Sequence, residues 1–211
     1  EEMTQNYLKT VKGQIKNHDV ETACRLIRQI LRADYVCDKD GEKLFYDDEH
    51  WVKLMFGSSG QQEIVWGLNI IFLAILKNEK TFLVFEEPES HLFPDSQAVI
   101  AELVALMIHS SGSRVIITTH SPYMLTAVNL LLYSGKEEEN RNKDTVVKKE
   151  LRLQPGSTGA YFLSNETGCL KNIMGTGKGL IDALEIDGIS DKINEQMDRI
   201  LENSVRHRGI L

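Results

Sequence analysis

The chain has 211 residues, of which 42% are hydrophobic and 26% are charged, a composition typical of a soluble globular protein. Its net charge of −7 argues against a dedicated nucleic-acid surface, because binding to phosphates needs clustered Lys and Arg. The three cysteines have no CxxC spacing, which disfavours a disulfide framework or a zinc site. We expect a cytoplasmic protein, because no signal peptide is visible and the longest apolar run, about residues 64–76, is too short to span a bilayer.

The first part of the chain is polar, with apolar residues spaced as on a helix. We expect a helical segment over residues 1–33, which could be the end of a longer helical or coiled-coil insertion. Met first appears at position 3, so we expect that a further part of the protein precedes Glu1. Residues 34–211 are then expected to form the main domain.

A hairpin is expected next, because an Asp-Gly turn at residues 39–41 separates two short strand patterns. The sequence WVKLMF, residues 51–56, predicts a strand that leads into the polar stretch FGSSGQQ, residues 56–62. Two interpretations of this stretch stay open. It can be a capped helix start, because Ser is a favoured N-cap. It can also be a helix end whose free backbone amides bind an anion such as a phosphate.

Helices and strands alternate after this stretch. We expect helices over about residues 61–77, 94–109 and 122–133, and strands over residues 81–85 and 114–119. The strands are unbroken runs of large apolar residues, which is typical of a parallel sheet covered on both faces. The alternation therefore predicts an α/β fold, a parallel sheet flanked by helices.

The remaining third of the chain begins with a charged run without apolar residues, and we expect a solvated loop over residues 134–145. Two additional edge strands are expected beyond it, in VVKKELRLQ (residues 146–154) and GAYFLSN (residues 159–165). The tail, residues 191–205, places its apolar residues on one helical face, so it predicts a last helix.

The most informative stretch is TFLVFEEPESHLFP, in which a buried strand ends in two adjacent carboxylates, Glu86 and Glu87. Ligands bind at the carboxyl ends of the strands in open α/β sheets. One acid can hold Mg²⁺, directly or through water, while the other orients or deprotonates an attacking water. The alternative is an ordinary strand that ends in a solvated acidic turn.

The next strand, in RVIITTHSPYML, ends in His120. Because this strand is expected to be parallel to the first, His120 should lie at the same edge of the sheet as the two acids. A histidine there can hydrogen-bond a γ-phosphate or the attacking water. A lone histidine can equally be a packing residue, and its position after the neighbouring strand favours the functional interpretation.

Three motifs, SSGQQ, FLVFEEPESHLFP and IITTHSP, together resemble the C-terminal half of an ABC-class ATPase, which is a P-loop NTPase. The nearest branch contains RecF, the SMC proteins and the OLD-like ATPases, and EEPESHLFP is most similar to the OLD-like members. The resemblance covers the chain from about Tyr35 to the C-terminus. It implies an AAA-type, ATP-binding protein with an ABC ATPase-like α/β fold.

The resemblance also implies roles for individual residues. Glu86 matches the Walker B acid that supports Mg²⁺, Glu87 the catalytic glutamate that polarises water, and His120 the switch histidine. Residues 89–94 take the place of the loop that crosses the dimer interface. The signature motif, which caps the γ-phosphate of ATP held by the opposite subunit, corresponds to Ser58, Ser59, Gly60, Gln61 and Gln62.

The sequence departs from the family pattern in several places. Gln61 stands where many ABC proteins have a second Gly, Glu86 replaces the more usual Asp, and Phe93 replaces a His common in OLD-like versions. No GxxxxGK[ST] motif is present in the sequence. The segment MGTGKGL, residues 174–180, is not one, because Gly179 follows the lysine. The Walker A half is therefore missing, and in this class it lies upstream.

The function expected from this resemblance is ATP hydrolysis by a homodimer that sandwiches two ATP molecules, with Mg²⁺. Turnover would drive work on DNA or license a separate nuclease or other effector subunit, in DNA repair or phage defence. The alternative is a nucleotide-gated scaffold that binds ATP with little hydrolysis, motivated by Glu86 and Gln61. A membrane transporter's nucleotide-binding domain fits less well, because such domains usually read like DEPTSALD, so we expect no membrane partner. Without a P-loop, this chain alone is expected to be inactive.

Overall fold

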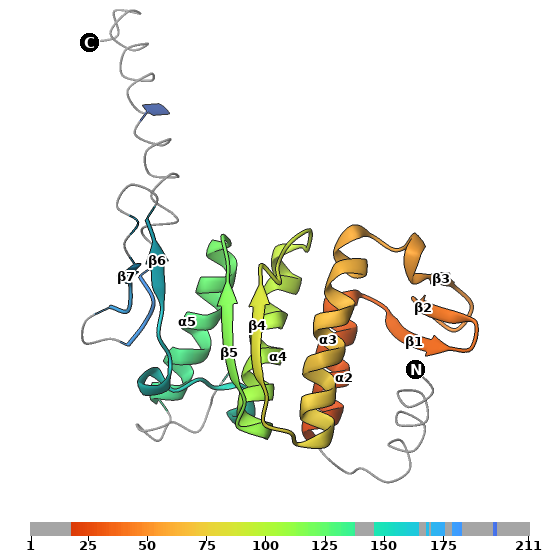
Figure 1. Cartoon of the computed structure of the whole chain (residues 1–211), viewed down its shortest axis with the longest axis horizontal. Helices are drawn as coiled ribbons and strands as arrows, with labels where there is room; N and C mark the ends of the chain where they lie inside the picture. Colours follow the sequence, from red (N-terminus) through yellow and green to blue (C-terminus); the bar gives the residue numbers. More distant parts are fainter. Residues whose placement is uncertain are drawn as a thin grey trace, which may run out of the picture.

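The computed structural model describes residues 18–137, 146–164, 168, 170–175, 179–182 and 196–197 (Figure 1). Residues 1–17 of the expected N-terminal helical segment lie outside this part, as does most of the expected tail helix. The second half of the N-terminal segment is helix α2, His18–Leu31, as expected. Its buried residues are spaced three or four apart, so one face of α2 enters the core.

Three short antiparallel strands follow: β1 (Asp34–Asp38), β2 (Gly41–Phe45) and β3 (Trp51–Lys53). The expected hairpin is confirmed, and Gly41 has a φ of +107°, which suits glycine. The strand predicted over residues 51–56 is only half correct. Leu54–Phe56 forms a 3₁₀ turn, because the amide of Gly57 closes onto the carbonyl oxygen of Leu54 at 2.8 Å and Leu54 turns into the core.

The predicted alternation of helices and strands is confirmed. The elements are α3 (Ser59–Lys77), β4 (Phe82–Glu86), α4 (Pro94–Ser111), β5 (Arg114–Thr118) and α5 (Pro122–Glu137). Strands β4 and β5 are parallel, with Phe82 opposite Arg114 and Glu86 opposite Thr118. The two strands therefore end at the same edge, as the sequence predicted.

Helix α5 is longer than expected, so the loop predicted over residues 134–145 is wrong in its first four residues. Ser134 remains helical and donates its hydroxyl to the carbonyl oxygen of Leu130 at 2.8 Å. Gly135 lets the helix pack closely, because a methyl group there would lie 2.0 Å from the carbonyl oxygen of Leu153. Residues 138–145 lie outside the described part of the chain.

The edge strand predicted over residues 146–154 is wrong. This segment contains a 3₁₀ turn, Lys149–Leu151, and it packs against α4. Val147 and Leu151 are both buried, and this spacing of four residues suits a turn better than the alternation of a strand. The second predicted edge strand is confirmed in part as β6 (Tyr161–Leu163), which pairs antiparallel with β7 (Leu170–Asn172).

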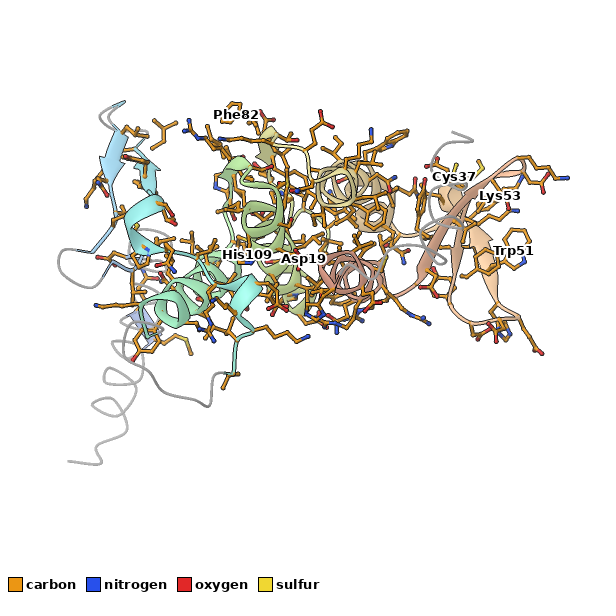
Figure 2. All side chains as sticks on the ribbon, turned by 90° about the horizontal axis from the view of Figure 1, so that it is seen from below. Asp19, Cys37, Trp51, Lys53, Phe82 and His109 are labelled. Carbon is orange, nitrogen blue, oxygen red and sulfur yellow. The ribbon has the colours of Figure 1, made fainter. Side chains whose placement is uncertain are left out.

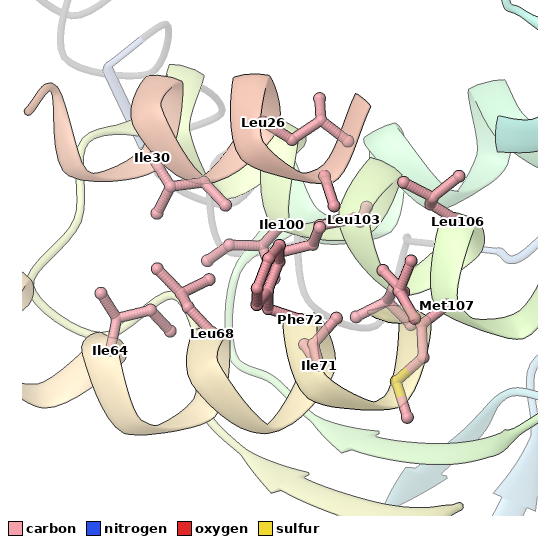
Figure 3. Close-up of a cluster of buried hydrophobic side chains, with 14 of the residues drawn as sticks. Leu26, Ile30, Ile64, Leu68, Ile71, Phe72, Ile100, Leu103, Leu106 and Met107 are labelled. Carbon is pink, nitrogen blue, oxygen red and sulfur yellow. The ribbon is translucent and has the colours of Figure 1, made fainter. Parts of the chain in front are cut away.

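The core lies between α2, α3 and α4, as Figure 3 shows. By length and composition α3 could cross a membrane, whereas the apolar run alone was expected to be too short. In the structure its apolar residues have another role, since Ile64, Leu68 and Ile71 are buried against α2 and α4. Packing within the chain therefore accounts for this buried face of α3, while Trp66 and Ile70 on the same helix are exposed.

The β4–β5 sheet has one covered face and one bare face within the described residues. The covered face packs against the core through Leu83, Phe85, Val115 and Ile117. The opposite face, which we call the outer face, carries Phe82, Val84 and Ile116, each at least half exposed. Figure 2 shows Phe82 pointing away from the helices that carry Asp19 and His109. Among the described residues, helices therefore cover one face of this sheet.

Candidate functional site

The start of α3 is held by a capping box. The side chain of Ser58 accepts a hydrogen bond from the amide of Gln61, and the amide of Ser58 donates to Oε1 of Gln61 at 2.9 Å. Nε2 of Gln61 also donates to the carbonyl oxygen of Leu31 at the end of α2, at 2.6 Å. The interpretation of FGSSGQQ as a capped helix start is therefore confirmed. Gln61 has a structural task that a glycine could not perform.

The anion interpretation now rests on the backbone of two residues. The Gln62 side chain is also engaged, because its Nε2 donates to the carbonyl oxygen of Gly57 at 2.7 Å. Ser59 and Gly60 are the first two residues of α3, so their amides have no acceptor within the helix. Ser59 is exposed. Gly60 is buried, so the Ser59 amide and hydroxyl are the exposed groups at this helix start that can meet an anion.

Gly60 brings α3 against the loop that follows β4. A methyl group at this position would lie 2.5 Å from the carbonyl oxygen of His91, which is closer than real contacts allow. His91 has a φ of +60°, so its backbone is in the left-handed region. The Nε2 atom of His91 lies 3.8 Å from a carboxylate oxygen of Glu63 on α3. The helix start and the acidic loop are therefore in direct contact.

The two expected acids lie at the carboxyl end of β4. Glu86 is the last residue of the strand and is exposed. Glu87 has a φ of +41°, a conformation that costs a non-glycine residue about 1–2 kcal/mol. Its amide donates to the carbonyl oxygen of Thr118 at 3.0 Å, which fixes the turn to the end of β5. Backbone strain of this kind clusters at functional sites.

Glu87 and His120, which the sequence assigned to catalysis, come together in the structure. Nε2 of His120 lies 3.4 Å from Oε1 of Glu87. Ser90 donates its hydroxyl to the other carboxylate oxygen of Glu87 at 3.3 Å. The side chains remain open to solvent, with exposed fractions of 51% for Glu87 and 88% for His120. A carboxylate and an imidazole so arranged can accept and donate protons at a bound water.

Glu89 is a residue whose place the sequence did not reveal. The prediction put residues 89–94 in an interface loop, but Glu89 is only 7% exposed. Its Oε1 accepts hydrogen bonds from the Thr119 hydroxyl at 2.5 Å and from the His120 amide at 3.0 Å. A further acid in the run EEPE looks like another solvated carboxylate, and no local signal marks it as buried.

Phe93, at the end of the same loop, is exposed, and the Arg32 guanidinium lies 4.8 Å from the centre of its ring.

The acids fit a metal that arrives with a nucleotide better than a metal bound by protein alone. Within the described residues no three His, Cys, Asp or Glu side chains converge on one point. Mg²⁺ usually keeps several waters and is held by one or two carboxylates together with phosphate oxygens. Glu86 can provide one such carboxylate, directly or through water. Bound Mg²⁺ would neutralise charge on the phosphates.

The segment MGTGKGL does not have the geometry of a phosphate-binding loop in its described residues. Met174 and Ile181 form an antiparallel bridge, and the amide of Gly175 donates to the carbonyl oxygen of Leu180 at 2.7 Å. A P-loop instead connects a strand to a helix. Residues 176–178 lie outside the described part.

A comparison with protein families bears on these motifs. Residues 2–125, more than half of the chain, match the model of the AAA ATPase domain. The chain belongs to the AAA ATPase domain family. The match includes the start of α3, both acids and His120, and this family's fold is an α/β fold of the P-loop type. Membership in the AAA ATPase family implies binding and hydrolysis of ATP, usually with Mg²⁺. A comparison with curated proteins gives no match.

Proposed function

We propose that this AAA ATPase chain is the C-terminal half of an ABC-class, OLD-like ATPase that hydrolyses ATP as a homodimer. One observation carries the proposal. Glu87 and His120 come from the ends of two neighbouring parallel strands, and their side chains lie 3.4 Å apart at an open edge of the sheet. Glu86 ends the same strand. An acid for Mg²⁺ and an acid for water are among the groups that phosphoryl transfer to water requires, and a histidine can stabilise charge on the γ-phosphate.

In this proposal each residue has one task. Glu87 orients and polarises the attacking water, while His120 donates a hydrogen bond to the γ-phosphate or to that water. The exposed Ser59 amide and hydroxyl, with the amide of the buried Gly60 next to them, would meet the γ-phosphate of ATP held by the other subunit, because the start of a helix favours anions. Ser58, Gln61 and Gln62 shape this helix start through the hydrogen bonds described above.

The bare outer face of the β4–β5 sheet supports the proposal that a P-loop half completes the domain. Parallel sheets occur almost only with both faces covered, and two strands alone are marginal. Phe82, Val84 and Ile116 would be buried when a further α/β segment packs on them. That segment would bring the GxxxxGK[ST] motif that this sequence lacks. Two complete domains related by a two-fold axis would then form two identical composite sites.

The wider setting of the proposal rests on the resemblance to OLD-like ATPases. ATP binding would close the dimer and hydrolysis would open it, so that ATP acts as a conformational switch. This switch would act on DNA or on a separate nuclease or effector subunit, in DNA repair or phage defence. We place the protein in the cytoplasm, without a membrane subunit.

The substitution Glu87→Gln tests the proposed activity. In an assembly that contains this chain and its P-loop half, we expect turnover of ATP to fall on the order of 100- to 10,000-fold, because a general base contributes that much. The ATP-bound dimer should accumulate, as measured by size-exclusion chromatography with light scattering. Glu79→Gln, a change of the same chemistry at an exposed residue, is the control.

The same assay separates hydrolysis from the scaffold alternative. A nucleotide-gated scaffold would show equally slow turnover in the wild type and in Glu87→Gln. The scaffold alternative was motivated by two departures from the family pattern, Glu86 and Gln61. The structure explains Gln61, because its side chain hydrogen-bonds the carbonyl oxygen of Leu31. For the 211-residue chain alone we expect no turnover of ATP. Turnover by this chain that depends on Glu87 would contradict the proposal that a separate P-loop half is needed to complete the site.

A further inference from the structure

The buried Glu89 side chain connects the loop after β4 to the loop after β5, the two loops that carry the proposed catalytic residues. Its carboxylate is buried, and Oε1 accepts from the Thr119 hydroxyl at 2.5 Å and from the His120 amide at 3.0 Å. Glu89 lies two residues after Glu87, on the loop that follows β4, while Thr119 and His120 follow β5. One oxygen atom therefore connects the loop that carries the acid to the loop that carries the histidine.

The link extends into the helices behind the sheet. Oγ1 of Thr119 accepts from the amide of Ser121 at 3.0 Å. The Ser121 hydroxyl donates to Oε1 of Gln97 on α4 at 2.6 Å and accepts from the amides of Tyr123 and Met124 at the start of α5. The backbone around His120 is thus fixed to both α4 and α5, and Glu89 is the charged member of this network.

The His120 side chain depends on this backbone for its position. It is 88% exposed, and its ion-pair contact among the described residues is the 3.4 Å approach to Glu87. An exposed imidazole with one long contact is not held by packing. Its location relative to Glu87 is therefore set by the course of the chain through Thr119 and His120.

The burial of Glu89 has a cost that folding alone does not explain. Its second oxygen, Oε2, is buried and has no hydrogen-bond partner among the residues that the structure describes. A buried carboxylate with an unpaired oxygen is unfavourable, and such groups in native structures usually have a functional reason. A neutral side chain would avoid most of this cost. A carboxylate, however, makes stronger hydrogen bonds to the Thr119 hydroxyl and the His120 amide than a neutral acceptor does.

We propose that Glu89 is a positioning residue, whose buried carboxylate holds the backbone of Thr119 and His120 so that the His120 imidazole stays within reach of Glu87. The inference deepens the proposed ATPase function and rests on it for its catalytic consequence. The geometric part, the coupling of Glu89 to His120, stands on the contacts themselves and can be measured without nucleotide.

The kinetic test compares Glu89→Gln and Glu89→Ala with wild type in the ATP-hydrolysing assembly. Gln keeps an oxygen that can accept from both donors, whereas Ala removes it. We expect kcat to fall on the order of 10- to 100-fold in Glu89→Ala and by less in Glu89→Gln, because misplacing a catalytic group by about 1 Å costs that much. KM for ATP should stay within about twofold, since the buried Glu89 carboxylate is not expected to contact the nucleotide. Glu79→Gln is again the control.

The geometric test uses amide hydrogen exchange and amide NMR shifts in the 211-residue chain. We expect the His120 amide to exchange faster in Glu89→Ala than in wild type by at least about tenfold, with an intermediate rate in Glu89→Gln. Amides in α2 and α3 should be unchanged, which separates a local release of His120 from general unfolding. If Glu89→Ala does not fold, Glu89→Gln alone still decides, through the shift of its His120 amide.

The outcomes of the two tests distinguish a failure of the positioning role from a failure of the proposed ATPase function. An unaltered His120 amide in both variants, or wild-type kcat in Glu89→Ala, would overturn the positioning role. A raised KM with unchanged kcat would overturn it too, because Glu89 would then act on binding. If the wild-type assembly does not hydrolyse ATP, the proposed function fails and kinetics are uninformative, but the exchange experiment still supports or overturns the Glu89–His120 link.

Discussion

The start of α3 and the carboxyl ends of β4 and β5 both carry polar residues, yet the chain uses them differently. At the helix start, Ser58, Gln61 and Gln62 each have a partner within the fold. At the strand ends, Glu87 adopts a left-handed backbone and its side chain stays half exposed next to His120. The first cluster would look the same in a protein that binds nothing, whereas the second holds an exposed acid and an exposed histidine side by side at a strained turn.

This difference shows where the evidence for function lies. A glycine- and serine-rich helix start is weak evidence for a phosphate site, because capping and close packing require the same residue types. An exposed acid and an exposed histidine brought together from two strands are stronger evidence, because exposed side chains contribute little to the stability of the fold. Four substitutions test the contrast.

The largest effect is expected from His120→Ala. Turnover in the ATP-hydrolysing assembly should fall on the order of 100-fold, since the substitution removes a hydrogen-bonding group at the reacting centre. The free energy of unfolding should change by less than about 0.5 kcal/mol, because the imidazole is 88% exposed. Urea denaturation of the 211-residue chain measures the second quantity. If His120→Ala instead lowered the free energy of unfolding strongly and left ATP turnover normal, the residues at the strand ends would have a structural role, as those at the start of α3 do.

Gly60→Ala should act on stability. The added methyl group would lie 2.5 Å from the carbonyl oxygen of His91, so helix and loop must separate. We expect a loss of about 1–3 kcal/mol in the free energy of unfolding, as for other overpacked sites. Gly156→Ala is the control, because a methyl group there meets no atom within 4 Å. Equal stability of the two variants would mean that Gly60 is not required for packing and would strengthen its role at a phosphate.

The smallest effect separates two neighbouring serines. Ser58→Ala removes the N-cap and should cost about 1 kcal/mol of unfolding free energy. Ser59→Ala should cost less than about 0.5 kcal/mol, because Ser59 is exposed at the first helical position and does not cap the helix. Paired urea titrations give both values. If Ser59→Ala proved the more costly change, the division between capping and ligand-facing residues at this helix start would be wrong.

Much of the fold followed from local patterns in the sequence. The apolar runs located α3, β4, α4, β5 and α5 to within a few residues. The segment over residues 146–154 was misassigned, because its short apolar pattern suits both a strand and a turn. The bare outer face could not be predicted, because residues on either face of a parallel strand are apolar and do not reveal what covers them.

The site was predictable where it depended on topology and not where it depended on distant contacts. Parallel neighbours end at one edge, so the meeting of Glu87 and His120 followed from the order of the strands. The bridge from Gln61 to Leu31 and the burial of Glu89 against Thr119 each join residues about 30 positions apart. No periodicity within a single element encodes such pairs.

The contact between Gly60 and His91 has a consequence for the proposed dimer. There, the start of α3 would face the ATP held by the partner, while Glu87, four residues before His91, would act on the ATP held by its own subunit. In that dimer, a shift of α3 toward one nucleotide would displace the loop that serves the other, because Gly60 lies against the backbone of His91. The two hydrolysis events would then be cooperative rather than independent, through a contact that only the absence of a side chain at Gly60 permits.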